Sequence, residues 1–136
     1  MKKKILYNQI IAIIVFFTIG NISAQKKDLM VRIAEIEIFS EYVSDYKLIL
    51  KEESSASVKL EPGVLAIFPM YQKNDSTQIK IIEIYQDNEA YQSHLKTPHF
   101  QKYKMSTIKM VKSLELIDMN TIDPESMKLL FRKMKE

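Results

Sequence analysis

Cysteine and tryptophan are absent from the 136 residues of this chain, and glycine occurs only twice. Without cysteine the protein has no disulfide bond, no thiol nucleophile and no thiolate ligand for a metal. A lipid anchor carried by a cysteine behind the N-terminal apolar segment is excluded for the same reason.

An excess of positive charge is also missing. The formal net charge is +3, but three lysines, Lys2, Lys3 and Lys4, open the chain. When these are set aside, the 20 lysines and arginines fall to 17, which equals the 17 aspartates and glutamates. Affinity for nucleic acid comes largely from neutralised phosphates, so a neutral domain without a basic stripe argues against nucleic acid as a partner.

The first 24 residues have the layout of a secretory signal peptide. The three lysines precede an apolar run from Ile10 to Gly20, and Ser23-Ala24 supplies small residues before Gln25. A spanning helix needs about 20 apolar residues, so this run is short for a permanent anchor and cleavage after Ala24 is favoured. We therefore expect an exported protein, periplasmic or extracellular, with no stable membrane anchor.

Beyond this segment, the spacing of apolar residues predicts an α+β fold. Period-two patterns rich in β-branched residues predict strands over 30–39, 64–72, 78–86 and 114–122. Three- and four-residue spacing and capping signals predict helices over 41–59, 87–96 and 99–111, and a last helix from 123. This β-α-β-β-α-β order with an extra C-terminal helix is the ferredoxin-like arrangement.

The length supports one folded domain, with 1–24 as signal peptide, 25–122 as the α+β domain and 123–136 as the C-terminal helix. A four-stranded sheet with helices on a single face leaves its other face open. Such a face commonly buries against a second copy of the chain, so we expect a homodimer.

Two histidines and one glutamate are the candidates for chemistry. His94 and His99 are the base candidates, because an imidazole has an unperturbed pKa near neutrality. Glu83 lies among isoleucines in the middle of a strand, where a carboxylate must face solvent or find a partner. Purely structural roles stay open for all three: His94 as a brace of the Thr97-Pro98 turn, His99 as an acceptor at a helix start, and Glu83 in a cross-strand pair. The two histidines do not have the i, i+4 spacing of a helical metal pair, so we expect no metal site.

Three stretches of the chain resemble the antibiotic biosynthesis monooxygenase family. The strand Ile82-Glu83-Ile84-Tyr85 leads into a helix and then into His94-Leu95-Lys96-Thr97-Pro98-His99-Phe100, which is similar to the His-x-x-Thr-x-His-aromatic signature of that family. Ile33-Ala34-Glu35-Ile36 and Glu61-Pro62-Gly63 match further stretches in the same order. Within the family the chain looks most like the small quinol monooxygenases, with the phospho-autoinducer isomerase branch close behind.

The resemblance implies a homodimeric α+β barrel with a pocket between sheet and helices. It implies oxidation of a quinol-like or phenolic small molecule by dioxygen, with no metal, flavin or haem as cofactor. On this basis we expect catalytic roles for His94, His99 and Glu83. We expect Tyr85, Phe68, Tyr46 and Phe100 to contact the substrate.

The same fold can also serve haem degradation, isomerisation or the binding of a ligand without catalysis. Haem-degrading relatives carry an Asn, a Trp and a His where this chain has Ile36, His94 and Lys104, so haem degradation is not expected. Isomerisation of a small hydroxy-ketone would use the same histidine and glutamate to move a proton between carbons. A non-catalytic dimeric module that holds an apolar ligand is the third alternative.

Overall fold

The structure is a computed structural model that describes residues 28–135, so the predicted signal peptide lies outside the described residues. The elements, in chain order, are β1 (Met30–Ile38), a 3-10 turn (Ser40–Tyr42), α1 (Val43–Leu60), β2 (Val64–Tyr71), β3 (Gln78–Tyr85), α2 (Asn88–His94), α3 (Pro98–Thr107), β4 (Val111–Met119) and α4 (Glu125–Lys133). The predicted ferredoxin-like order and the additional C-terminal helix are confirmed. Among the helices in the described range, none is both long and apolar enough to span a membrane.

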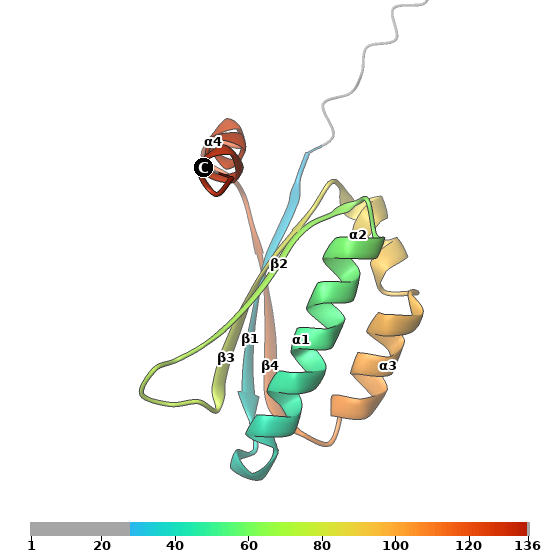
Figure 1. Cartoon of the computed structure of the whole chain (residues 1–136), viewed down its shortest axis with the longest axis vertical. Helices are drawn as coiled ribbons and strands as arrows, with labels where there is room; N and C mark the ends of the chain where they lie inside the picture. Colours follow the sequence, from blue (N-terminus) through green and yellow to red (C-terminus); the bar gives the residue numbers. More distant parts are fainter. Residues whose placement is uncertain (1–27, 136) are drawn as a thin grey trace, which may run out of the picture.

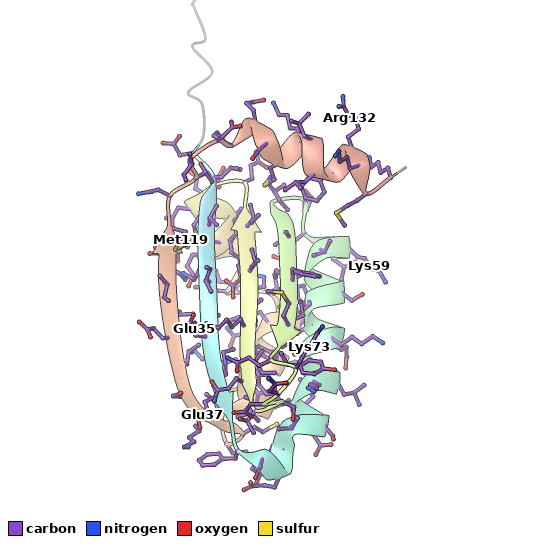
Figure 2. The ribbon with its side chains drawn as sticks, turned by 90° about the vertical axis from the view of Figure 1, so that its left-hand side faces the viewer. Glu35, Glu37, Lys59, Lys73, Met119 and Arg132 are labelled. Atoms are coloured by element: carbon purple, nitrogen blue, oxygen red, sulfur yellow. The ribbon has the colours of Figure 1, made fainter. Side chains whose placement is uncertain are left out.

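The four strands form one antiparallel sheet in the order β2-β3-β1-β4. Helices α1, α2 and α3 lie on one side of this sheet, and α4 lies on the opposite side at one end of the strands (Figure 1). Figure 2 looks onto the face without α1 to α3, with α4 running across the ends of the strands. We call the two surfaces of the sheet the covered face and the open face.

Alternation along the central strand separates the two faces. Ala34, Ile36 and Ile38 of β1 point to the covered face and are almost fully buried. They pack with Tyr46 and Leu50, which form the inner stripe of α1, in one core cluster. Burial of these apolar side chains fastens α1 onto the sheet and leaves the polar face of the helix to solvent.

An irregularity at the start of β2 changes which of its residues face the helices. The pairing of β2 with β3 shifts register between Val64 and Ala66. One extra residue in a strand reverses the alternation beyond it, because side chains alternate with a period of exactly two. As a result Ile67 faces the helices opposite Glu83, while Phe68 pairs with Ile82 on the open face.

Gly63 allows α2 to approach the start of β2. A Cβ atom at this position would lie only 2.5 Å from the Cβ of Ala90 in α2. The Gly63 carbonyl also accepts a hydrogen bond from the Gln86 N–H at 2.8 Å. The glycine is required by space and not by its backbone angles, since it does not have a positive φ. This close approach brings α2 beside the C-terminal end of α1, where the candidate site lies.

Candidate functional site

A cavity of about 330 Å³ lies between the covered face and the helices. Most of its wall is aliphatic and aromatic, with contributions from all four strands and from α1, α2 and α3. Its polar or titratable lining residues are Arg32, Glu53, Glu83, Tyr85, Tyr91, His94, Tyr103, Lys104 and Thr107. An apolar hollow with a few convergent polar groups is the usual form of a small-molecule site.

His94 is the imidazole of this cavity. It is the last residue of α2, and only 3% of its surface is exposed. Its Nδ1 atom lies 3.0 Å from Oε1 of Glu61, while its Nε2 atom lies 3.7 Å from Oε1 of Glu53. The rings of Tyr85 and Phe100 flank it, with centroid distances of 5.4 and 4.7 Å. The ring is therefore held on its edges by carboxylates and on its sides by aromatic groups.

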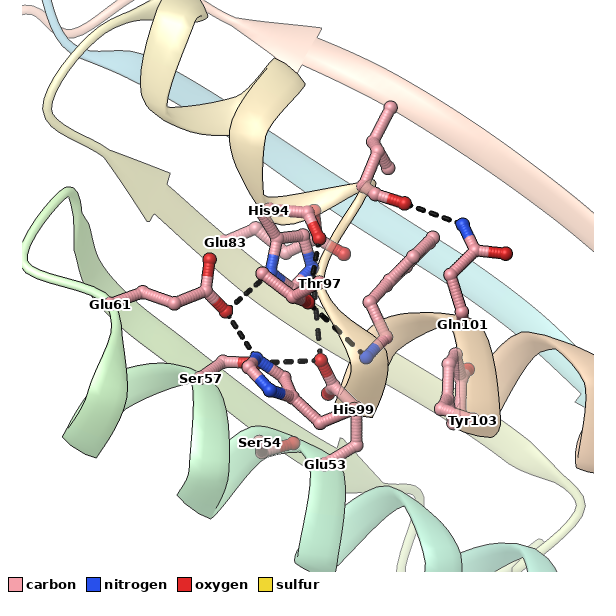
Figure 3. Close-up of polar contacts among 12 residues, drawn as sticks. Glu53, Ser54, Ser57, Glu61, Glu83, His94, Thr97, His99, Gln101 and Tyr103 are labelled. Carbon is pink, nitrogen blue, oxygen red and sulfur yellow. Dashed lines mark hydrogen bonds and ion pairs between the residues drawn. The ribbon is translucent and has the colours of Figure 1, made fainter.

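Glu61 lies between the two histidines of the chain (Figure 3). The same oxygen, Oε1, is 2.5 Å from Nε2 of His99. Burial alone would raise the pKa of Glu61, but the hydrogen bonds of His99 and His94 outweigh it and hold this pKa below its usual value. When an ionised Glu61 accepts from Nδ1–H of a neutral imidazole at His94, Nε2 on the Glu53 side is the unprotonated nitrogen.

His99 does not reach the cavity wall. It is the second residue of α3 and contacts Glu61, and neither of these two residues lines the cavity. The expectation that His99 is a base alternative to His94 is therefore not supported by its position. It is placed to act on His94 through Glu61.

A second carboxylate, Glu53, faces His94 from α1. Glu53 is 5% exposed, and its Oε1 accepts a hydrogen bond from Oγ of Ser57 at 2.7 Å. Burial raises the pKa of Glu53, while the Ser57 hydrogen bond and the nearby His94 act in the opposite direction. Burial prevails, so the pKa of Glu53 lies above its usual value.

Glu83 and Tyr85 share the covered face of β3, as their spacing predicts, and both line the cavity. The Tyr85 hydroxyl donates to Oε2 of Glu83 at 3.1 Å. Burial raises the pKa of Glu83, and the Tyr85 hydrogen bond opposes this only in part. Burial also raises the pKa of Tyr85, so both groups of the pair hold their protons more strongly than in water.

The aromatic residues expected to contact substrate are placed in three different ways. Phe100 lines the cavity beside His94. Tyr46 is fully buried behind the wall, where its hydroxyl lies 2.6 Å from that of Tyr103, a lining residue whose pKa is raised by burial to about 12. The expectation that Phe68 contacts substrate in the cavity is wrong, because Phe68 is 60% exposed on the open face. The register shift in β2 reverses its orientation.

The bend between α2 and α3 is formed by the stretch from His94 to Phe100 and positions both histidines. Oγ1 of Thr97 accepts from the Phe100 N–H at 3.3 Å and donates to the His94 carbonyl at 2.8 Å. Pro98 occupies the first turn of α3, where its missing N–H has no cost. The turn therefore ends one helix and starts the next so that His94 and His99 meet at Glu61.

Three site residues lie outside the sequence-based expectation. Glu53 and Ser57 were not predicted, and Glu61 entered only as part of the Glu-Pro-Gly stretch. A signal for the first two exists in the spacing, because Tyr46, Leu50, Glu53 and Ser57 continue one buried stripe of α1 at four- and three-residue steps. A glutamate within such a stripe must have a buried partner.

The sequence profile of the antibiotic biosynthesis monooxygenase family matches residues 29–105, which is more than half of the chain. The chain belongs to this family. A crystal structure from Bacteroides thetaiotaomicron, provisionally named an antibiotic biosynthesis monooxygenase, is 45% identical with a TM-score of 0.70 and covers 71% of this chain and 92% of its own. A provisionally named monooxygenase from Lactobacillus acidophilus is 27% identical with a TM-score of 0.66, over 68% of this chain and 44% of its own. No curated protein sequence matches the chain.

A more distant neighbour from Nitrosomonas europaea, 15% identical with a TM-score of 0.67, covers 72% of this chain and 94% of its own and shares the fold. Family membership and these neighbours support a monooxygenase-like function for this chain.

Proposed function

We propose that this protein is a monooxygenase that oxidises a quinol-like or phenolic small molecule with dioxygen and needs no bound cofactor. The observation that carries the proposal is the buried His94 at the cavity wall. One of its ring nitrogens is held by the Glu61 carboxylate, and the other lies on the side of the cavity. This is the arrangement of a general base whose tautomer is set by a carboxylate partner.

The reaction begins with removal of the phenolic proton by Nε2 of His94. The resulting phenolate passes one electron to dioxygen, and the phenoxyl radical and superoxide then combine at a ring carbon to form a carbon–oxygen bond. The peroxide takes back the proton from the His94 imidazolium and becomes a hydroperoxide. Loss of water from the hydroperoxide leaves a quinone. One oxygen atom of O₂ enters the product, and the second leaves as water with two hydrogens, one from the phenolic O–H and one from the oxidised carbon.

The remaining cavity groups favour a small, largely apolar aromatic substrate. The cavity volume of about 330 Å³ is at the lower end of the range for small-molecule sites. Glu83, whose pKa burial raises, and Tyr85, whose hydroxyl donates to it, are the polar pair of the cavity wall that can hydrogen-bond a substrate oxygen. Phe100 and Tyr103 supply aromatic surface for the ring.

Export and a homodimer are part of the same proposal. The open face carries exposed apolar side chains on both edge strands, among them Phe68, Met70 and Met119 at 60, 37 and 43% exposure. A second copy of the chain would cover them. Light scattering of the purified protein tests the dimer, and N-terminal sequencing of the protein recovered from the periplasm or medium tests cleavage after Ala24. A monomer at micromolar concentration contradicts the dimer.

Oxygen uptake with a panel of hydroquinones and phenols tests the activity. We expect substrate-dependent uptake that survives a chelator and falls about 10²- to 10⁴-fold in His94→Gln, the usual contribution of a general base. His99→Gln is the matched control, and a smaller decrease is expected because His99 lies behind Glu61. Uptake no faster than autoxidation contradicts the proposal. Turnover of a hydroxy-ketone without oxygen consumption would instead establish an isomerase.

A further inference from the structure

Both histidines of the chain meet at one carboxylate. The sequence contains two histidines and no cysteine, so every strong nitrogen or sulfur side-chain ligand for a transition metal lies in this cluster. Glu61, His94 and His99 each offer one ligand atom, and these atoms all lie within 4.8 Å of one another. They come from the end of α1, the end of α2 and the start of α3 (Figure 3). Because these residues lie in three different segments, the i, i+4 spacing of a metal pair on a single helix does not apply to them.

The distances are close to those of a metal site. Zinc lies about 2.0–2.2 Å from imidazole nitrogen and carboxylate oxygen, so two of its ligands are separated by roughly 3–3.5 Å. Nδ1 of His94 and Oε1 of Glu61 are already 3.0 Å apart. Nε2 of His99 is 2.5 Å from the same oxygen, so it would have to move outward by less than about 1 Å. His99 begins a helix and is 18% exposed, which permits this shift.

An outer partner for the metal-binding form of His94 is also present. When Nδ1 of a histidine binds a metal, Nε2 carries the proton and needs an acceptor. Oε1 of Glu53 lies 3.7 Å from this nitrogen and is fixed by the Ser57 hydroxyl at 2.7 Å. Glu61, whose pKa the two histidines hold below its usual value, supplies a negative charge next to a divalent ion. Glu61 and His99, at 12 and 18% exposure, provide a path from solvent.

We propose that Glu61, His94 and His99 form an inhibitory binding site for a divalent transition metal ion such as Zn²⁺. The inhibitory part rests on the proposed function. A metal on Nδ1 moves the imidazole proton to Nε2, where it points to Glu53, and the base is lost. The metal is not placed to take part in the oxidation, because neither Glu61 nor His99 lines the cavity.

Titration calorimetry with Zn²⁺ on the purified, tag-free protein tests the binding. We expect one ion per chain, and d–d absorption of tetrahedral intensity when Co²⁺ replaces Zn²⁺. Glu61→Gln and His99→Ala are expected to weaken binding at least 100-fold, and Glu53→Gln about 10- to 100-fold, as for outer-sphere partners. The matched control is Glu52→Gln, an exposed glutamate of α1 paired with Lys102, and its affinity for Zn²⁺ should be unchanged.

Three results would overturn the site: no saturable binding below millimolar Zn²⁺, a stoichiometry different from one, or affinities of the Glu61 and His99 variants within threefold of the parent chain. Circular dichroism melting verifies that each variant is folded. If Glu61→Gln does not fold, the decision passes to His99→Ala, because this side chain lies outside the buried core.

Oxygen uptake with increasing Zn²⁺ tests the inhibition separately. We expect uptake to fall with the occupancy measured by calorimetry and to return when EDTA is added. Zinc that binds at the cluster but leaves uptake unchanged, or raises it, refutes inhibition. A chain that binds Zn²⁺ and oxidises nothing refutes the proposed function and the inhibitory role while leaving the site intact. A chain that oxidises phenols and does not bind Zn²⁺ refutes only the metal site.

Discussion

The two faces of the sheet carry glutamates in different surroundings. On the open face, Glu35 is paired with Lys80 and Glu37 with Lys112, and the four side chains are 32 to 54% exposed. On the covered side, Glu83 is held by a buried tyrosine, and Glu53 is held by a buried serine beside His94. In the single chain, the same residue type is thus an exposed ion-pair partner on one face and a cavity group on the other.

This difference indicates which glutamates belong to the candidate site. A surface ion pair contributes about 0–1 kcal/mol, so the open-face pairs explain solubility and strand pairing and little else. A buried carboxyl group costs free energy unless its partners compensate, and such costs are retained where a site needs the group. The covered glutamates therefore mark the site more reliably than any of the open-face charges. Four substitutions test this contrast, from the largest expected effect to the smallest.

The Glu61→Gln variant should show the largest effect. Glutamine offers one neutral acceptor to two imidazole donors, so the tautomer and the orientation of His94 are no longer fixed. We expect kcat to fall about 100-fold with little change in KM, measured by oxygen uptake. A decrease in KM comparable with that in kcat would contradict a positioning role. The open-face substitution Glu37→Gln serves as the matched control.

The Gly63→Ala variant should destabilise the covered side near α2. The new methyl group would lie 2.5 Å from the Cβ of Ala90, and overpacking of this kind costs about 1–3 kcal/mol. Urea unfolding measures the loss. The double variant Gly63→Ala with Ala90→Gly removes the opposing methyl group and should recover most of it. Equal losses in the single and double variants would show that the close contact is not the cause.

The Glu83→Gln variant should gain stability at neutral pH and lose activity. Because burial raises the pKa of Glu83 in the folded state, the unfolded chain ionises first as the pH rises, and the folded protein loses stability above about pH 4.3. Glutamine has no proton to lose, so we expect a gain of about 1 kcal/mol at pH 7 and no gain at pH 3. Thermal melting at both pH values measures this. A gain that is independent of pH would contradict the burial argument.

The Glu37→Gln variant should have the smallest effect. Its partner Lys112 is 54% exposed, and the pair lies on the open face at 2.6 Å. We expect a change in the free energy of unfolding below about 0.5 kcal/mol, decreasing further in high salt, and no change in oxygen uptake. A loss above 1 kcal/mol in urea unfolding would mean that the open face depends on its charges and that the contrast between the faces fails.

Local patterns account for the elements and for part of the site. The alternation of Ile81, Glu83 and Tyr85 sets these residues on one face of β3, and both polar members do line the cavity. Thr97-Pro98 predicts the break between α2 and α3, since a capping hydroxyl and a proline act on the backbone within a few residues. His94 and Phe100 flank this break and face the same cavity.

Phe68 and His99 show where local patterns end. One register shift in β2 turns Phe68 to the open face. Such a shift depends on how β2 pairs with β3, and the period-two pattern of β2 alone does not reveal it. His99 shares the signature stretch with His94, yet only the position of α1 determines that Glu61 stands between them.

The sequence by itself determined the strands, the helices, their order and the family, because these follow from contacts between residues a few positions apart and from a continuous signature. Only the tertiary structure decided that Glu61, 33 residues before His94 and 38 before His99, joins their two rings, and that Glu53 faces the same imidazole. The physical reason is that one carboxylate oxygen must come within hydrogen-bonding distance of nitrogens from two other helices. That distance is set by how α1, α2 and α3 pack on the sheet.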